Sequence, residues 1–266
     1  RGPTPTYRGM PVLDPKDVLT EEVKAWKGLH LLHFVGSSCS QKVRIFLLEK
    51  GLEWESHEVN LRGVPYEAAG RVVLPAHQNT QEWFLGISPT GMVPVLVHDG
   101  VVVIESNDIL GYLEALCPNP PMIRPDDAPL LQQEDDLHLD LRMISFHAGG
   151  SAGKDPDAVA ALERGMRPGL CGPNGQDGPQ QVAWFRQYAA GDRGAAVAQA
   201  QARFRAAAEG LEARVADSDT WLSGGAPGAL DVAWFVYLYR LVRVLPEGAG
   251  LSLEGLPRMQ RLLEAA

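Results

Sequence analysis

The sequence has little cysteine, and this shortage limits the kind of protein it can encode. Its three cysteines, Cys39, Cys117 and Cys171, are too few and too scattered for a disulfide framework or a cysteine-rich zinc site. We therefore expect a reducing location, the cytoplasm, or an organelle if a targeting segment was removed ahead of Arg1.

The sequence also lacks a long apolar run and an excess of basic residues. Its longest apolar run, around residues 232–238, is broken by Arg240 and is well short of the roughly 18–20 residues that span a bilayer. Lys and Arg number 24 against 33 Asp and Glu, so the formal net charge is −9. We therefore expect neither membrane insertion nor a nucleic-acid-binding face.

The first half of the chain contains alternating strand and helix signals. Apolar residues 29–35 predict a strand, residues 37–50 a helix and residues 54–59 a second strand. An Asp-Gly pair within the valine-rich residues 93–104 predicts a hairpin, and Ser106 is the predicted N-cap of the helix that follows. This order predicts a mixed four-stranded sheet with helices on its faces.

Beyond a proline-rich stretch, the second half contains only helix signals. We divide the chain into an N-terminal extension (1–27), an α/β domain (28–117), a linker (118–129) and a helical bundle domain (130–266). The predicted fold class is therefore α/β plus all-α, and two domains suit a length of 266 residues. The glycine-rich residues 165–179 predict a loop.

The segment Ser37-Ser38-Cys39 is the first that could carry chemistry, because it joins the end of a strand to the start of a helix. The free N–H groups and the helix dipole at such a point stabilise an anion, and a thiol bound there loses its proton more readily. The alternative is a capped helix start with a buried cysteine and no chemical role.

Two further pairs lie near the predicted hairpin. A cis bond at Val93-Pro94 would leave the Val93 backbone free for a ligand, although a proline on an edge strand without any role is the alternative. Ser106 could bind a carboxylate and Glu105 an ammonium group, which together suit an α-amino acid, although simple helix capping is the alternative. The His, Asp and Glu residues lack metal-ligand spacing, so we expect no metal.

These three segments, in this order, resemble the glutathione transferase superfamily. Residues 37–45 resemble the Ser-Ser-Cys motif of its zeta class, which includes maleylacetoacetate isomerases, and that of the related tetrachlorohydroquinone reductive dehalogenase; the usual Trp-Arg is here Gln41-Lys42. The resemblance implies a thioredoxin-like N-terminal domain that binds glutathione, a helical C-terminal domain that binds a small electrophile, and a homodimer.

The resemblance also implies roles for single residues. Ser37 matches the residue that activates the glutathione thiol, and Cys39 matches the cysteine of the motif. Val93 would pair its backbone with the cysteinyl unit of glutathione, next to a cis Pro94. The implied glutathione-binding residues are Ser37, Ser38, Val93, Pro94, Glu105 and Ser106.

Three functions follow from the resemblance. The first is attack of an activated glutathione thiol on an electrophile, ending in conjugation or in cis–trans isomerisation. The second is reductive dehalogenation or ether cleavage, in which Cys39 resolves a glutathionyl intermediate. The third is a binding protein that keeps the fold without turnover. Between Ser37 and Cys39, the sequence leaves open which residue carries the reaction.

Overall fold

The computed structural model describes residues 12–68, 72–151, 153–165, 167, 170, 178–215, 220–246 and 248–265. The chain forms two compact units: Arg1–Cys117 with Lys154–Gln187, and Pro118–Gly153 with Tyr188–Ala266. This division differs from the predicted one, in which residues 130–266 form a single helical domain, because residues 154–187 group with the first unit. Much of the predicted loop 165–179 lies outside the described residues.

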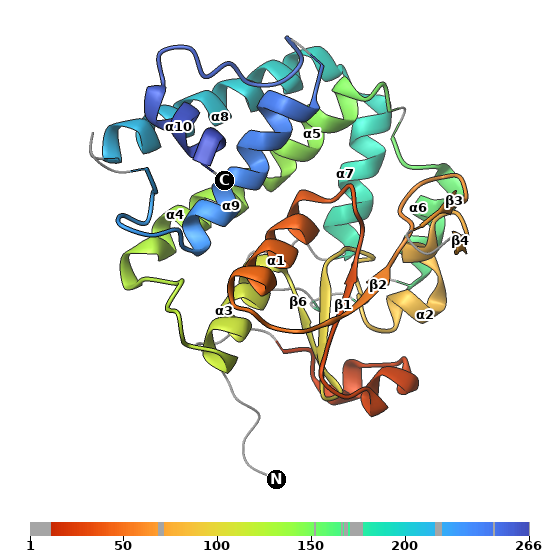
Figure 1. Ribbon diagram of the computed structural model, residues 1–266. Helices are drawn as coiled ribbons and strands as arrows, with labels where there is room; N and C mark the ends of the chain where they lie inside the picture. The colour runs from red at the N-terminus through yellow and green to blue at the C-terminus, as the bar shows by residue number, and fades with distance from the viewer. Residues whose placement is uncertain are drawn as a thin grey trace. The chain divides into compact units, whose positions relative to one another are not determined.

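A mixed four-stranded sheet forms the centre of the first unit, as predicted (Figure 1). The strand order is β2-β1-β5-β6, with β1 parallel to β2 and the other pairs antiparallel. Asp99 and Gly100 between β5 and β6 both have positive φ, as the type I′ hairpin turn requires. The strands are β1 (Leu29–His33), β2 (Glu55–Glu58), β5 (Val95–His98) and β6 (Val101–Ile104).

Helices α1 (Ser38–Glu49) and α3 (Ser106–Leu116) pack against each other in the same unit. Their apolar residues recur at helical spacing and are buried, including Val43 and Phe46 of α1 and Leu110 of α3. The other elements of this unit are η1 (Pro15–Asp17), η2 (Glu21–Ala25), β3 (Tyr66–Glu67), β4 (Val73–Leu74), η3 (Gln78–Thr80), α2 (Glu82–Leu85), α6 (Pro156–Gly165) and most of α7 (Gly178–Ala190).

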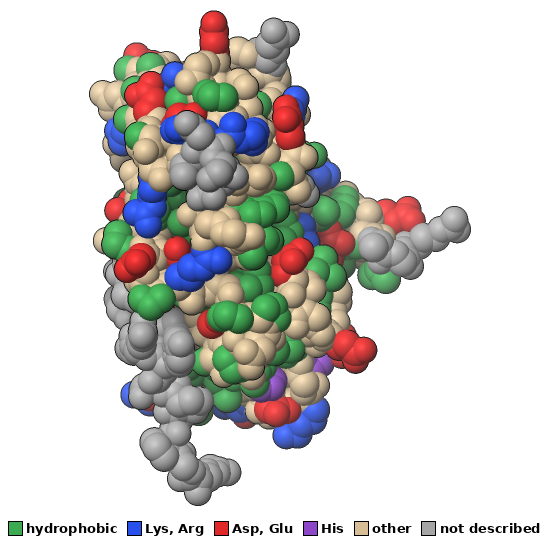
Figure 2. All heavy atoms as spheres, turned by 60° about the vertical axis from the view of Figure 1, so that its left-hand side comes forward, with side chains coloured by type: hydrophobic (Ala, Val, Ile, Leu, Met, Phe, Trp, Pro, Cys, Tyr) green, Lys and Arg blue, Asp and Glu red, His purple; other side chains and the backbone are tan. Residues whose placement is uncertain are grey.

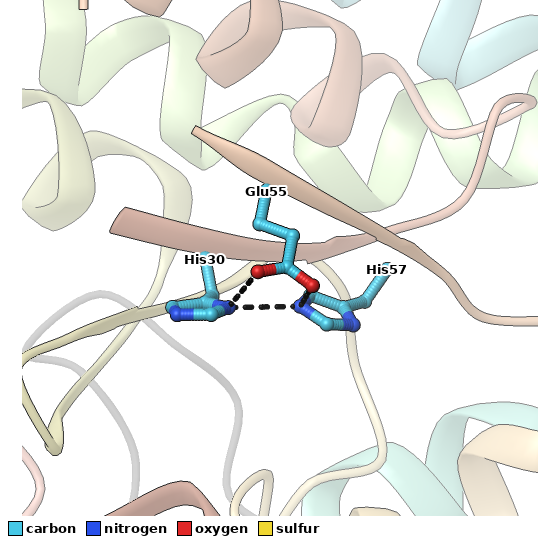
Figure 3. A group of neighbouring side chains, drawn as sticks. All are labelled: His30, Glu55 and His57. Carbon is cyan, nitrogen blue, oxygen red and sulfur yellow. Dashed lines mark hydrogen bonds and ion pairs between the residues drawn. The ribbon is translucent and has the colours of Figure 1, made fainter. Parts of the chain in front are cut away.

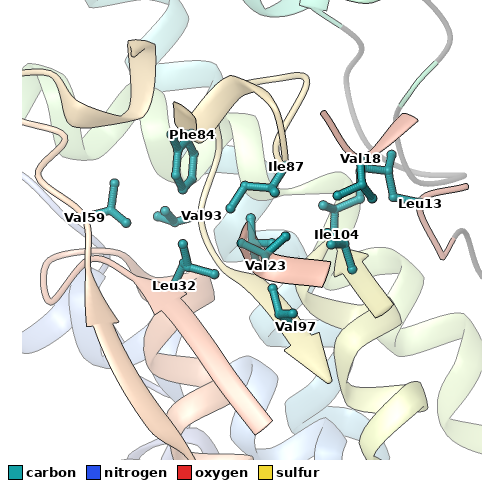
Figure 4. Packing of buried hydrophobic residues seen from close by; sticks show 12 residues of the cluster. Leu13, Val18, Val23, Leu32, Val59, Phe84, Ile87, Val93, Val97 and Ile104 are labelled. Carbon is teal, nitrogen blue, oxygen red and sulfur yellow. The ribbon is translucent and has the colours of Figure 1, made fainter. Parts of the chain in front are cut away.

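Residues 12–27 belong to the core of the first unit, so the prediction that they lie ahead of the fold is wrong. Leu13, Val18 and Val23 are buried in a cluster with residues of the sheet and α2, among them Leu32 and Phe84 (Figure 4). The Leu13 N–H also donates to the Val102 carbonyl, so this segment runs beside the outer strand β6. The remainder of the predicted extension, 1–11, lies outside the described residues.

The second unit is helical. Helix α9 (Ala229–Tyr239) is apolar nearly all round and buried. Asp231 in its first turn accepts the N–H groups of Leu222, Ser223 and Gly228, so this carboxylate has a structural role. The elements of the second unit are η4 (Pro125–Asp127), α4 (Ala128–Asp136), α5 (His138–Ala148), α8 (Arg193–Arg214), α9 (Ala229–Tyr239), the π-helical turn η5 (Arg240–Val244) and α10 (Pro257–Ala265).

Two features of the structure concern the surface charge and the apolarity of the helices. On the face drawn in Figure 2, acidic and basic side chains are interspersed, with no gathering of one sign. Among the described helices, none combines the length and apolarity that a membrane span needs.

Candidate active site

The register of the sheet brings the three sequence segments to one end of the first unit. Leu32 of β1 pairs with Val95 of β5, and Val95 pairs with Ile104 of β6. The residues just beyond the end of β1, just before β5 and just after β6 therefore lie side by side. Ser37 follows the end of β1, Val93-Pro94 directly precedes β5, and Glu105-Ser106 directly follows β6. The sheet thus assembles a site whose parts are far apart in the sequence.

Ser37 is the N-cap of α1, and its side chain is half-buried. Its Oγ accepts the Ser40 backbone N–H at 3.2 Å, as the residue type predicts for this position. Among the described residues, the Ser37 hydroxyl donates to no acceptor. The hydroxyl hydrogen is therefore available to an anion at the helix start. Ser38 is buried, and Cys39 is half-buried and forms no disulfide with another described residue; both lie in the first turn of the same helix.

The loop that leads to Val93 is held by side chains on both sides. The Ser88 hydroxyl donates to the Met92 carbonyl at 2.8 Å and accepts the Met92 N–H at 3.0 Å, while the Asn79 amide donates to the Gly91 carbonyl at 2.7 Å. The Val93-Pro94 peptide bond is cis, as the resemblance implies. Within the described part of the chain, the Val93 backbone N–H and carbonyl have no hydrogen-bonding partner.

The start of α3 differs from the prediction by one residue. Ser106 was expected as the N-cap, but Glu105 takes that position and Ser106 is the first helical residue. Glu105 has a φ of 67°, in the region that non-glycine residues rarely adopt, and its carbonyl accepts the Ile109 N–H. In the part of the chain that the structure describes, the Ser106 N–H and hydroxyl have no partner, so both can meet an anion.

A buried lysine that the sequence analysis missed ties the two helix starts together. Lys42 of α1 is fully buried, and its Nζ donates to Asn107 Oδ1 of α3 at 2.7 Å. The only signal in the sequence was the motif itself, since Lys42 stands where the resembled motif has Arg. Because α1 and α3 both begin at this site, the contact fixes the spacing of Ser37 and Ser106 indirectly.

The electrostatics beneath the site are set by His33 and Arg44. Arg44 Nη1 lies 3.1 Å from His33 Nδ1 and also donates to the Phe34 carbonyl at the end of β1. Burial, with a smaller contribution from the Arg44 charge, lowers the pKa of His33 to about 4. His33 is therefore neutral at physiological pH, and Arg44 supplies a positive charge next to the strand end.

The chemistry of these groups suits an extended peptide with an acidic thiol. Val93 offers an N–H and a carbonyl, unpaired among the described residues, that can pair with a ligand backbone, and Ser106 offers donors for a carboxylate. Ser37 offers a hydroxyl hydrogen at a helix N-terminus, where a thiolate is stabilised.

Comparisons with known proteins point in the same direction. The family described as "Glutathione S-transferase, N-terminal domain" matches residues 36–116, and "Glutathione S-transferase, C-terminal domain" matches residues 194–265. A zeta-class glutathione S-transferase of Euphorbia esula is 41% identical over 98 residues, 37% of this chain and 38% of that protein. The match thus spans little more than a third of that relative, and three other plant glutathione S-transferases match over 34–38% of their lengths.

Longer matches cover nearly the whole chain. Maleylacetoacetate isomerase of Pseudomonas aeruginosa is 27% identical over 90% of this chain and 91% of that protein. The crystal structure of β-etherase LigF from Sphingobium sp. strain SYK-6 has the same fold, with a TM-score of 0.59 and 22% identity over 89% of this chain and 93% of that chain. With both domains of the family matched in order, over more than half of the sequence, the chain belongs to the glutathione S-transferase family.

Proposed function

We propose that this chain binds glutathione at the end of the sheet and lowers the pKa of its thiol for attack on a small organic electrophile. The observation that carries the proposal is the Ser37 hydroxyl, which caps α1 and keeps its hydrogen available. The unpaired Val93 backbone would pair with the cysteinyl unit, and Glu105 with Ser106 would hold the γ-glutamyl end.

The stabilisation required is modest. A free thiol of this type has a pKa of roughly 8.5, so little thiolate exists at neutral pH. A hydrogen bond from Ser37 to the sulfur, together with the helix N-terminus, need lower that pKa by only about 1–2 units, which corresponds to about 1.4–2.8 kcal/mol. A charge-assisted hydrogen bond contributes energy of this size.

Two outcomes follow addition of the thiolate to the electrophile. If the adduct is released, the product is a thioether; if the added glutathione is expelled after bond rotation, the product is a cis–trans isomer. The zeta-class and maleylacetoacetate isomerase relatives support isomerisation of an unsaturated acid as the first reaction to assay.

The test combines calorimetry with a thiolate titration. We expect the wild-type chain to bind glutathione, and the ultraviolet absorption of bound thiolate to appear at a lower pH than for free glutathione. In Ser37→Ala, that pH should rise by about 1–2 units and turnover at neutral pH should fall roughly 10- to 100-fold. Ser252→Ala, which removes an exposed hydroxyl, is the matched control and should behave as wild type.

Two results would overturn the proposal. Absence of binding up to millimolar glutathione would exclude glutathione as the ligand. Binding with an unshifted thiol pKa and no turnover on any electrophile would instead favour a binding protein that keeps the fold.

Cys39 supports a second candidate, reductive cleavage of an ether or a carbon–halogen bond. Its thiol lies in the first turn of α1, two residues after Ser37. Glutathione would displace the leaving group, and the Cys39 thiolate would then attack the glutathionyl sulfur to form a mixed disulfide while the organic product takes a proton. Cys39→Ala should then abolish reductive cleavage and spare conjugation, with Cys117→Ala as the matched control.

A further inference from the structure

Three side chains meet at the start of β1, at the opposite end of that strand from Ser37. His30 Nδ1 lies 3.0 Å from His57 Nε2 and 3.4 Å from Glu55 Oε2, and His57 Nε2 lies 3.8 Å from Glu55 Oε1 (Figure 3). All three belong to the first unit, and none of them takes part in the candidate active site.

Strand pairing creates this group. In the parallel register His30 pairs with Glu55, and Leu32 pairs with His57. Since side chains alternate along a strand, Glu55 and His57 share the face on which His30 lies. The sequence analysis found no metal-ligand spacing, because spacing along one segment does not reveal a set of residues that two paired strands bring together.

The surroundings of the group favour the tautomer of His30 that a metal needs. His30 Nε2 lies 2.8 Å from the Lys27 carbonyl, which can only accept, so Nε2 carries the hydrogen and Nδ1 keeps its lone pair. The Trp26 ring lies 4.6 Å from each of the His30 and His57 rings and fixes their orientation.

We propose that His30 Nδ1, His57 Nε2 and the Glu55 carboxylate bind a divalent transition-metal ion of the zinc type. Zinc takes tetrahedral N and O ligands at about 2.0–2.2 Å, which places neighbouring ligand atoms about 3.3 Å apart. The three observed separations lie within about 0.5 Å of that value. Two imidazoles and one carboxylate suit zinc, copper or nickel, whereas calcium and magnesium prefer oxygen alone.

The three side chains differ in exposure, which gives the group a rigid buried part and a part that an ion can reach. His30 is buried, with 8% of its side chain exposed, and the Glu55 side chain is 66% exposed. The exposed carboxylate leaves a path for the ion and a position for water as a fourth ligand. The His30 tautomer is held by a backbone carbonyl, which is the usual outer contact of a metal-binding histidine.

A metal ion here would join the outermost strand to its neighbour. β2 lies at the edge of the sheet and is only four residues long, and its Glu55 and Ser56 are exposed. An ion bound to both strands would hold β2 against β1 in the folded state only, and would therefore stabilise folding by mass action.

The experiment uses the full chain without a polyhistidine tag, stripped of metal by a chelator. We expect it to bind one equivalent of Co²⁺, with the ligand-field absorption of a tetrahedral site, and one equivalent of Zn²⁺ in competition with a chromogenic chelator. Glu55→Gln and His57→Asn should each weaken binding by roughly tenfold or more, since even loss of an outer contact costs about 10- to 100-fold. Zinc should raise the unfolding temperature of the wild type.

Matched controls remove the same groups elsewhere. Glu53→Gln changes an exposed carboxylate two residues before Glu55, and His147→Gln removes an exposed histidine of α5; both should bind as wild type. Glu55 is exposed, so Glu55→Gln tests the site without disturbing the packing against Trp26. The proposal fails if the wild type binds no Co²⁺ or Zn²⁺ at one equivalent, in which case the three groups form only a hydrogen-bonded network. It also fails if Glu55→Gln and a folded His57→Asn both bind the ion as tightly as the wild type.

Discussion

Burial and the contacts of His33 lower its pKa and keep this residue neutral in the folded chain. Its Nδ1 faces Arg44, and its Nε2 lies 2.7 Å from Ser56 Oγ. The guanidinium can only donate, so Nδ1 must accept and Nε2 must carry the hydrogen. A second proton on Nδ1 would point at a positive charge in a buried position. The sequence pattern places His33 in the strand predicted over 29–35 but does not reveal these partners, which come from α1 and β2.

We predict that acid destabilises the chain in a window defined by His33. The unfolded state binds a proton below about pH 6.5, whereas the folded state does so only near its pKa of about 4. The unfolded state therefore holds more protons between these values, and the free energy of unfolding should fall by on the order of 3 kcal/mol as the pH drops through them. Urea denaturation at a series of pH values measures this slope.

His33→Gln tests the assignment, because glutamine can keep both hydrogen bonds without titrating. The variant should show a flatter dependence on pH between 6.5 and 4 than the wild type. His147→Gln, which removes an exposed histidine, should keep the wild-type slope. An unchanged slope in His33→Gln would show that other groups cause the acid sensitivity.

At the scale of elements, α1 and α3 are joined by a buried ion pair. Lys50 Nζ at the end of α1 lies 2.5 Å from Glu114 Oε2 of α3 and 2.8 Å from the Cys117 carbonyl, and the two side chains are 0% and 10% exposed. Removal of one partner leaves a charge in the interior, which costs far more than the pair contributes.

We predict that Lys50→Met lowers the free energy of unfolding by about 3–5 kcal/mol, and that Lys50→Met with Glu114→Leu recovers most of the loss. A double-mutant cycle in urea measures the coupling between the two residues. The exposed pair Lys24–Glu21 is the control, with side chains 34% and 79% exposed, and its Lys24→Met should change stability by less than about 1 kcal/mol. A loss in the double variant equal to the sum of the losses in Lys50→Met and Glu114→Leu would exclude the coupling.

The elements that the sequence predicted best are those with periodic side chains or defined turns. The valine runs around Asp99-Gly100 and the helix after residue 37 depend on local chemistry, and both formed as predicted. Residues 12–27 have no such period, because their buried positions, Leu13, Val18 and Val23, are five residues apart between prolines and charges. Their burial depends on the surface that they cover, which no local pattern describes.

The distinction between local patterns, which the sequence reveals, and packing between distant segments, which it does not, also applies to the candidate site and to the whole molecule. Motif order alone predicted Ser37, Val93 and Ser106 together, but the Lys42–Asn107 contact and the histidine group require the strand and helix pairing. The assignment of 154–187 to the first unit likewise follows from packing. There, Arg167 donates to the carbonyls of Asp17 and Leu85, which ties residues beyond α6 to the segment 12–27 and to α2.

The packing of α6 against the loop before Val93 makes a prediction at this largest scale. Gly91 has a φ of 66°, and a Cβ built on it would lie 2.4 Å from Leu162 Cδ2 of α6 and 3.0 Å from the Asn79 carbonyl oxygen. Gly51, at the end of α1, has a similar φ of 62°, but a Cβ there would meet nothing within 4 Å. The two glycines thus differ in their surroundings and share their backbone conformation.

We therefore predict that Gly91→Ala destabilises the chain more than Gly51→Ala does. Gly51→Ala should cost about 1–2 kcal/mol for the left-handed backbone, whereas Gly91→Ala should cost about 1–3 kcal/mol more because α6 and the Asn79 backbone must move. Gly91→Ala should also weaken glutathione binding, since the loop carries Val93, while Gly51→Ala should not. Urea denaturation and calorimetry measure both effects. Equal losses of stability would mean that neither α6 nor the Asn79 backbone crowds Gly91.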